Sequence, residues 1–353
     1  MVRLVDFIDS EICKRKILKL SSFAEKNPIF HKKTQDAANA LFIDKDRESF
    51  LNKLNEIREE YAAVLGDNTP AVSLYLYSIG FPLYMHGQRE LGIPEKIVTD
   101  TVRDINVWIS NHKAMFHEDG FSQDGWILNH FLGELYQVGR LQYQITKYTN
   151  PTEVYRKDDS VLVAAKAGVE LEDDGDCVYE KPAVKKTVYE RKGDVLTAHF
   201  INKTTGLVSL EPETVNLSGW EMVLGDQEDV LSIHIPAIGK MDYALCKQSI
   251  SQAVTFFQKY FPHYEIKGFI CASWLLSNEV KEMLPPQSNI VQFSNLFTRN
   301  IAKGHYYLID KWIFGLDVED PLSVEPTSTL MRKTQALMKS GGQIYERGGF
   351  LLI

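Results

Sequence analysis

Cysteine is scarce in this sequence, and its spacing is informative. The 353 residues include four, Cys13, Cys177, Cys246 and Cys271, and no two of them form a CxxC pair. This spacing excludes a locally encoded zinc ribbon or redox dithiol, so we expect no metal. We expect the cysteines to be reduced and buried, in a cytoplasmic protein.

Long apolar runs and excess positive charge are also missing. No run of 18 apolar residues occurs, and the N-terminal residues lack the apolar stretch of a signal peptide, so we expect a soluble protein with no membrane partner. The formal net charge is −8. A nucleic-acid-binding protein needs a basic surface to neutralise phosphates, so we expect no nucleic-acid partner.

The common catalytic signatures are absent. The sequence contains no GxGxxG, GxxxxGK[ST], HExxH or GxSxG. This removes the simplest dinucleotide, P-loop, zincin and serine-hydrolase interpretations. A dispersed nucleophile–base pair remains open because its members meet only in the fold, and Cys271 with His234 is one candidate.

The apolar period changes near residue 139. Helical spacing of apolar residues predicts helices over 6–24, from 46 to 65, from 69 to 85, from 94 to 109 and over 125–138. From Gly139 onward the period becomes two, which is typical of strands. We therefore predict a helical N-terminal domain at 1–138 and an α/β domain at 139–353, α+β overall.

The second part contains one well-defined unit. Apolar strands at 230–235 and 266–271 flank an amphipathic helix at 242–260, and such a crossover predicts two parallel strands. We predict further strands at 290–293 and 305–314 and a helix at 327–339. Residues 170–193, which are acidic and then basic, predict a solvated loop or hairpin. Between the first strand and the helix, a turn with Gly239 beside Lys240 is a candidate anion site.

Together, several blocks resemble a bacterial family in which a helical N-acyltransferase N-terminal domain precedes a GNAT-like C-terminal domain. The resemblance spans roughly residues 139–300, and the helical first part fits the same layout. It is carried by the following residues: Gly139-Arg140-Leu141-Gln142, Trp220, Val230-Leu231, His234-Ile235-Pro236, Gly239, Ser249, Ala253, Phe256-Phe257, Phe261-Pro262, Cys271, Ser273-Trp274-Leu275-Leu276, Ser288-Asn289-Ile290 and Phe293.

The resemblance implies a mixed-sheet fold and a coenzyme A site. In such enzymes a strand splays from its neighbour to admit the pantetheine, and the next loop holds the pyrophosphate. By that analogy Ile233 and Ile235 line the pantetheine, and the pyrophosphate lies on Ile238, Gly239, Lys240 and Met241. The loop departs from the usual Gly-rich pattern, since it has one glycine, and Pro236 lacks an N–H donor.

Acyl transfer to an amine needs a base and an oxyanion or thiolate partner. His234 is the candidate base, although a structural role in the core is equally open. Ser273 is the candidate hydroxyl donor, although it also suits a cap position. We expect both to face one cleft. His305, Tyr306 and Tyr307 are further candidate acids.

We therefore expect an N-acyltransferase that uses coenzyme A or acyl-coenzyme A as co-substrate and acts on a small-molecule amine or peptide. Two alternatives remain: a non-catalytic GNAT-like ligand-binding or regulatory module, and a cysteine or serine hydrolase. The sequence does not define the acyl chain, the acceptor or the oligomeric state.

Overall fold

The computed structural model describes residues 2–179, 181–304, 306 and 308–353, and the chain forms two compact units. The first unit comprises the chain up to Gln144 with Ile235–Lys240 and Ser249–Phe261. The second comprises Ile145–His234, Met241–Gln248 and Pro262–Ile353. No helix among the described residues has both the length and the apolar character of a membrane span. The domain boundary at residue 138 stays a prediction.

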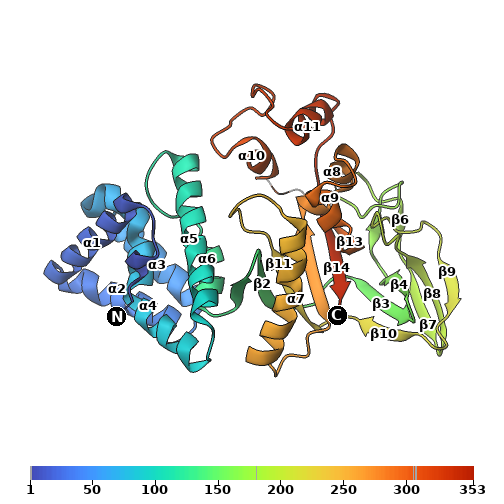
Figure 1. The fold of residues 1–353 in the computed structure, drawn as a ribbon, viewed down its shortest axis with the longest axis horizontal. Helices are drawn as coiled ribbons and strands as arrows, with labels where there is room; N and C mark the ends of the chain where they lie inside the picture. The colour runs from blue at the N-terminus through green and yellow to red at the C-terminus, as the bar shows by residue number, and fades with distance from the viewer. Residues whose placement is uncertain (1, 180, 305, 307) are drawn as a thin grey trace. The chain divides into compact units, whose positions relative to one another are not determined.

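The first unit begins with helices, as predicted (Figure 1). Side-chain caps set several starts: Ser10, Asn27 and Asp46 each accept a hydrogen bond from a first-turn amide. The helices are η1 (Leu4–Asp6), α1 (Glu11–Lys26), α2 (Pro28–Phe42), α3 (Arg47–Leu65), η2 (Gly66–Ala71), α4 (Val72–Glu90), α5 (Glu95–Phe116) and α6 (Asp124–Phe131).

The predicted last helix is too long. It ends at Phe131, because Gly133 takes a positive φ of 75° and donates to the His130 carbonyl, while Glu134 donates to the Asn129 carbonyl. These two bonds form a Schellman motif, which stops a helix. Residues 135–138 instead form β1 (Leu135–Val138), which pairs antiparallel with β2 (Leu141–Lys147).

The second unit contains a mixed sheet. Its order is β11 (Asp229–His234), β12 (Gly268–Ser273), β14 (Glu346–Leu352) and β13 (Thr298–Gly304), and α7 (Tyr243–Tyr260) follows β11 in the chain. The pair β11–β12 is parallel, which confirms the predicted crossover unit, whereas β14 runs antiparallel to both its neighbours.

A second, antiparallel sheet packs on one face of the first. Buried Val154 and Val163 from this sheet share a core with Val230 and Phe350. Its strands are β10 (Glu221–Leu224), β3 (Thr152–Lys157), β4 (Ser160–Ala165), β8 (Val195–Phe200) and β7 (Tyr189–Lys192), with β9 (Glu213–Asn216) on β8. The short strands β5 (Glu170–Leu171) and β6 (Lys185–Lys186) form a separate hairpin.

Two predicted strands are wrong. Residues 290–293 lie in α9 (Asn289–Ser294), which Ser288 caps by accepting from the Val291 amide, and Ile309–Phe314 is α10. His305 and Tyr307 lie outside the described residues. The remaining helices are η3 (Trp274–Leu276), α8 (Asn278–Met283) and α11 (Thr329–Lys339), and α11 confirms the predicted late helix.

Candidate functional site

The parallel strands β11 and β12 pair over only part of their length. The described register consists of Leu231 with Phe269 and Ser232 with Ile270. β11 continues to His234 and β12 to Ser273, beyond the described register. The described register therefore covers the middle of the two strands, and their carboxyl ends lie at the edge where open sheets of this kind place ligands.

The register assigns His234 and Ser273 to opposite faces. Partners across a sheet point the same way and successive residues alternate, so His234 shares a face with Ser232, Ile270 and Ala272. Ser273 shares the other face with Cys271, and both are buried. The expectation that His234 and Ser273 face one cleft is therefore wrong.

At the carboxyl ends of the two strands, the face of His234 is the more accessible one. His234 is half-buried, and Ala272 near the end of β12 is exposed. On the opposite face, Ile233 and Cys271 are each 2% exposed. A group that exchanges protons with a substrate needs contact with it. His234, which is half-buried with its Nε2 atom enclosed, suits such contact better than the buried residues Ile233 and Cys271.

Ser273 acts as a cap. It is 9% exposed, and its Oγ accepts a hydrogen bond of 3.2 Å from the Leu275 amide at the start of η3. A serine hydroxyl that accepts one bond still has a proton to donate. The geometry thus supports the capping alternative and does not require a catalytic role.

Cys271 has the character of a core residue. Burial raises the pKa of its thiol to about 12. The nucleophilic form of cysteine is the thiolate, which this environment disfavours. Because Cys271 and His234 also point to opposite faces, they do not form a nucleophile–base pair.

The loop between β11 and α7 is exposed from Ala237 to Lys240. Gly239 has a φ of 137°, which side chains rarely permit, and a Cβ there would meet nothing within 4 Å. Three loop carbonyls accept hydrogen bonds from the Arg140 guanidinium. The sequence does not predict this role of Arg140; the only local signal is its place in the two-residue turn between β1 and β2.

The N-terminus of α7 is already occupied in part. The Asp242 carboxylate accepts a bond of 2.9 Å from the Leu245 amide, and the Asn289 side chain accepts one of 3.4 Å from the Tyr243 amide. A carboxylate at this position competes with a bound anion for the free amides of the first helical turn. It also competes for the positive end of the helix dipole. An anion in this region therefore depends on the loop more than on the helix end.

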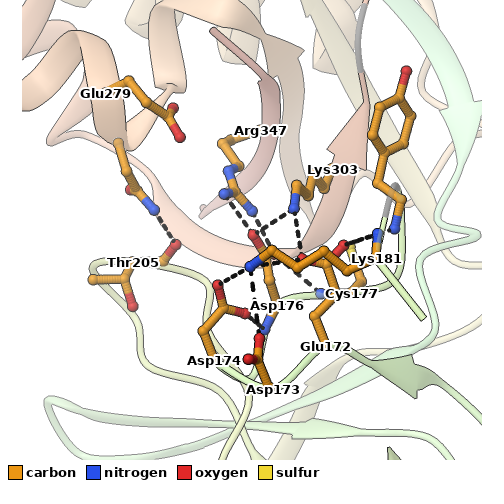
Figure 2. A network of polar contacts seen from close by, with 12 residues as sticks. Glu172, Asp173, Asp174, Asp176, Cys177, Lys181, Thr205, Glu279, Lys303 and Arg347 are labelled. Carbon is orange, nitrogen blue, oxygen red and sulfur yellow. Dashed lines mark hydrogen bonds and ion pairs between the residues drawn. The ribbon is translucent and has the colours of Figure 1, made fainter. Parts of the chain in front are cut away.

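A separate buried ion network lies between strands and the β5–β6 hairpin of the second unit (Figure 2). Arg347 on β14 donates to both oxygens of Asp176, and Lys303 on β13 contacts Asp176 and Glu172 at 3.2 Å each. Glu172 and Asp176 are 0% and 4% exposed, so the prediction of a solvated segment is wrong for these two residues.

The network holds the Glu172 carboxylate in its charged form. Burial acts to raise the pKa of Glu172, but bonds from the Tyr179 amide and the Lys303 ammonium prevail and lower it to about 2. The negative charges of Glu172 and Asp176 are balanced by the positive charges of Lys303 and Arg347. Such a balanced buried network is typical of a structural role. Among the described residues, no group of three or more His, Cys, Asp or Glu side chains has the arrangement of a metal site.

Comparison with known families gives two matches. The model of the GNAT-like C-terminal domain matches residues 135–351, and that of the N-acyltransferase N-terminal domain matches residues 21–133. No curated protein matches the sequence.

Several crystal structures share the fold. An acyltransferase mutant in complex with octanoyl-CoA has a TM-score of 0.61 at 16% identity, covering 98% of this chain and 85% of that one. An acyltransferase in complex with decanoyl-CoA and teicoplanin has 0.60 at 16%, covering 98% and 84%. A further acyltransferase with decanoyl-CoA has 0.55 at 17%, covering 82% and 68%. At these identities the likeness concerns the fold alone.

Proposed function

Because the chain belongs to the family of the GNAT-like C-terminal domain, we propose that it transfers an acyl group from acyl-coenzyme A to an amine. The observation that carries this proposal is the short described register of the parallel strands β11 and β12, with a loop of available amides following β11 in the chain. Strand backbone groups suit the amide groups of pantetheine, and loop amides suit a diphosphate.

In this proposal one segment of chain binds the co-substrate. The backbone of Ile233 and Ile235 lines the pantetheine, and the region from Ile238 through Gly239 and Lys240 to Met241 holds the diphosphate. The side chain of Ile233 is buried, so its contribution comes from backbone groups. No metal takes part.

The proposed chemistry requires one proton acceptor. The amine nitrogen attacks the thioester carbon, a C–N bond forms, and the C–S bond breaks. The proton lost by the amine passes through His234 to the departing thiolate, which leaves as free coenzyme A. His234 suits this step because imidazole is the most common proton acceptor in catalysis and because the residue is half-buried at the end of β11. Ser273 lies on the other face, and its role in this proposal is structural: it caps η3 at the end of β12.

The relatives in the crystal structures suggest the first substrates to try. They hold octanoyl-CoA, decanoyl-CoA and teicoplanin, so we propose medium-chain acyl-CoA donors and a peptide amine acceptor. The four free cysteines support a cytoplasmic location, where acyl-CoA is found.

The test combines binding with turnover. Calorimetry with coenzyme A and octanoyl-CoA measures binding, and thiol release in the presence of teicoplanin or simple amines measures transfer. We expect binding by the wild type, a loss of turnover of about 100-fold in His234→Ala with binding kept, and weaker coenzyme A binding in Gly239→Val. Absence of coenzyme A binding in the wild type would overturn the proposal.

A second function remains as a candidate: a ligand-binding module without turnover. The Asp242 carboxylate at the start of α7 and the missing N–H of Pro236 favour it, because both reduce the diphosphate site. Coenzyme A binding together with no thiol release for any amine tried would favour this module over the enzyme.

A further inference from the structure

Arg140 connects the turn between β1 and β2 to the loop after β11. Its Nη1 donates to the Pro236 carbonyl at 3.0 Å, its Nη2 to the Gly239 carbonyl at 3.0 Å, and its Nε to the Lys240 carbonyl at 3.5 Å. One planar guanidinium thus donates hydrogen bonds to three carbonyls of the loop after β11. This loop is exposed and contains a single glycine.

The turn that presents Arg140 is itself fixed. Val138 and Leu141 pair across it, and Gly139 takes a φ of 69°. Buried Ser249 on α7 accepts from the Leu141 amide at 3.1 Å and donates to the Val138 carbonyl. The Ser249 side chain therefore binds the backbone on both sides of the two-residue turn. These bonds restrict the position of the Arg140 backbone within the turn.

The direction of the carbonyls determines the direction of the amides. All described peptide bonds are trans, and in a trans peptide the N–H points opposite to the C=O. When the carbonyls of Pro236, Gly239 and Lys240 point to Arg140, the following amides point away from it. These amides belong to Ala237, Lys240 and Met241, and no described residue accepts a hydrogen bond from any of them.

We propose that Arg140 is a positioning residue that turns three loop amides outward as a cradle for the diphosphate of coenzyme A. This inference rests on the proposed function. It assigns the anion contacts to the loop rather than to the end of α7, where Asp242 and Asn289 already use two amides. The guanidinium also adds positive charge behind the cradle.

The experiment compares ligands with and without the diphosphate. Calorimetry measures the affinities of coenzyme A, dephospho-coenzyme A and S-octanoyl-pantetheine for the wild type, Arg140→Ala and Arg140→Lys. Exposed Arg89 on α4 has no described partner for its side chain, and Arg89→Ala is the matched control. Circular dichroism melts verify that each variant is folded.

We expect Arg140→Ala to lose about ten- to a hundredfold in affinity for both diphosphate ligands and to bind S-octanoyl-pantetheine as the wild type does. Arg140→Lys keeps the charge but not the three-donor fork, so it should recover only part of the loss. Arg89→Ala should match the wild type with every ligand.

Other outcomes separate the two proposals. Wild-type coenzyme A binding with an unchanged Arg140→Ala overturns the role of Arg140 and leaves the proposed function standing. An equal loss for all three ligands, or full recovery in Arg140→Lys, also overturns it, because the effect would then be general structure or charge. No coenzyme A binding by the wild type overturns the proposed function itself.

Discussion

Arg347 and Asp176 form a two-pronged ion pair, with Nη–Oδ distances of 2.5 and 2.7 Å, although 171 positions separate them in the chain (Figure 2). Arg347 is 7% exposed and Asp176 4%, so neither charge is compensated by bulk water. The pair joins β14 to the segment after β5.

The first prediction concerns this pair. Asp176→Asn should lower the free energy of unfolding by roughly 3–5 kcal/mol, because it leaves the buried charge of Arg347 uncompensated. Urea denaturation measures the change. Asp173→Asn is the control, since Asp173 is exposed and its contact with Lys181 is a surface one, which predicts a change below about 1 kcal/mol. Equal effects of the two substitutions would show that the buried pair contributes nothing special.

The second prediction concerns acid stability. The pKa of Glu172 is about 2 in the folded protein and 4.5 ordinarily. A lowered carboxylate pKa stabilises the fold above pH 4.5, and this contribution disappears as the pH falls toward 2. The wild type should therefore lose more stability than Glu172→Gln between about pH 6 and pH 3. Parallel pH profiles of the two proteins would contradict this assignment.

The third prediction concerns Ser249, which is 0% exposed and also contacts the Tyr143 hydroxyl at 2.8 Å. Ser249→Ala removes bonds to both flanks of the β1–β2 turn and leaves buried backbone groups unpaired. We expect a loss of roughly 1–3 kcal/mol in chemical denaturation. Ser251→Ala, at an exposed position of the same helix, should be close to neutral. The prediction is wrong if the two variants unfold at the same urea concentration.

The fourth prediction concerns Cys271. Because it is 2% exposed and its thiol pKa is about 12, iodoacetamide should leave it unmodified in the folded protein at neutral pH. Cys177, the only one of the four cysteines that is not fully buried, should react first. Mass spectrometry of tryptic peptides identifies the modified residues. Rapid labelling of Cys271 would restore the cysteine-hydrolase alternative.

Sequence patterns predicted the secondary structure correctly where nearby residues determine it. The unit from β11 through α7 to β12 was predictable, because strand length, helix period and chain order all indicate one crossover. The segment at 290–293 was not, since four apolar-rich residues fit a strand or a helix turn, and the Ser288 cap decides between them.

Distant partners explain the other failures. Glu172 and Asp176 lie in an acidic stretch that is typical of a solvated loop, and the cations that make their burial possible are Lys303 and Arg347, far along the chain. Likewise the helix after Gly125 ends early because of Gly133, a signal that was present but outweighed by apolar spacing. Within the candidate site, the loop and His234 stay predictions, and the sequence indicated neither the opposite facing of Ser273 nor the contacts of Arg140.

The position of β14 between β12 and β13 has a kinetic consequence. β13 precedes β14 in the chain, yet in the described sheet it hydrogen-bonds only to β14. β13 therefore cannot hydrogen-bond to this sheet until β14 has paired with β12. β14 follows the α10–α11 segment in the chain. Closing such a long loop costs entropy before any contact repays it. β13 should therefore join the sheet together with β14, and both strands should gain protection from hydrogen exchange in the same step.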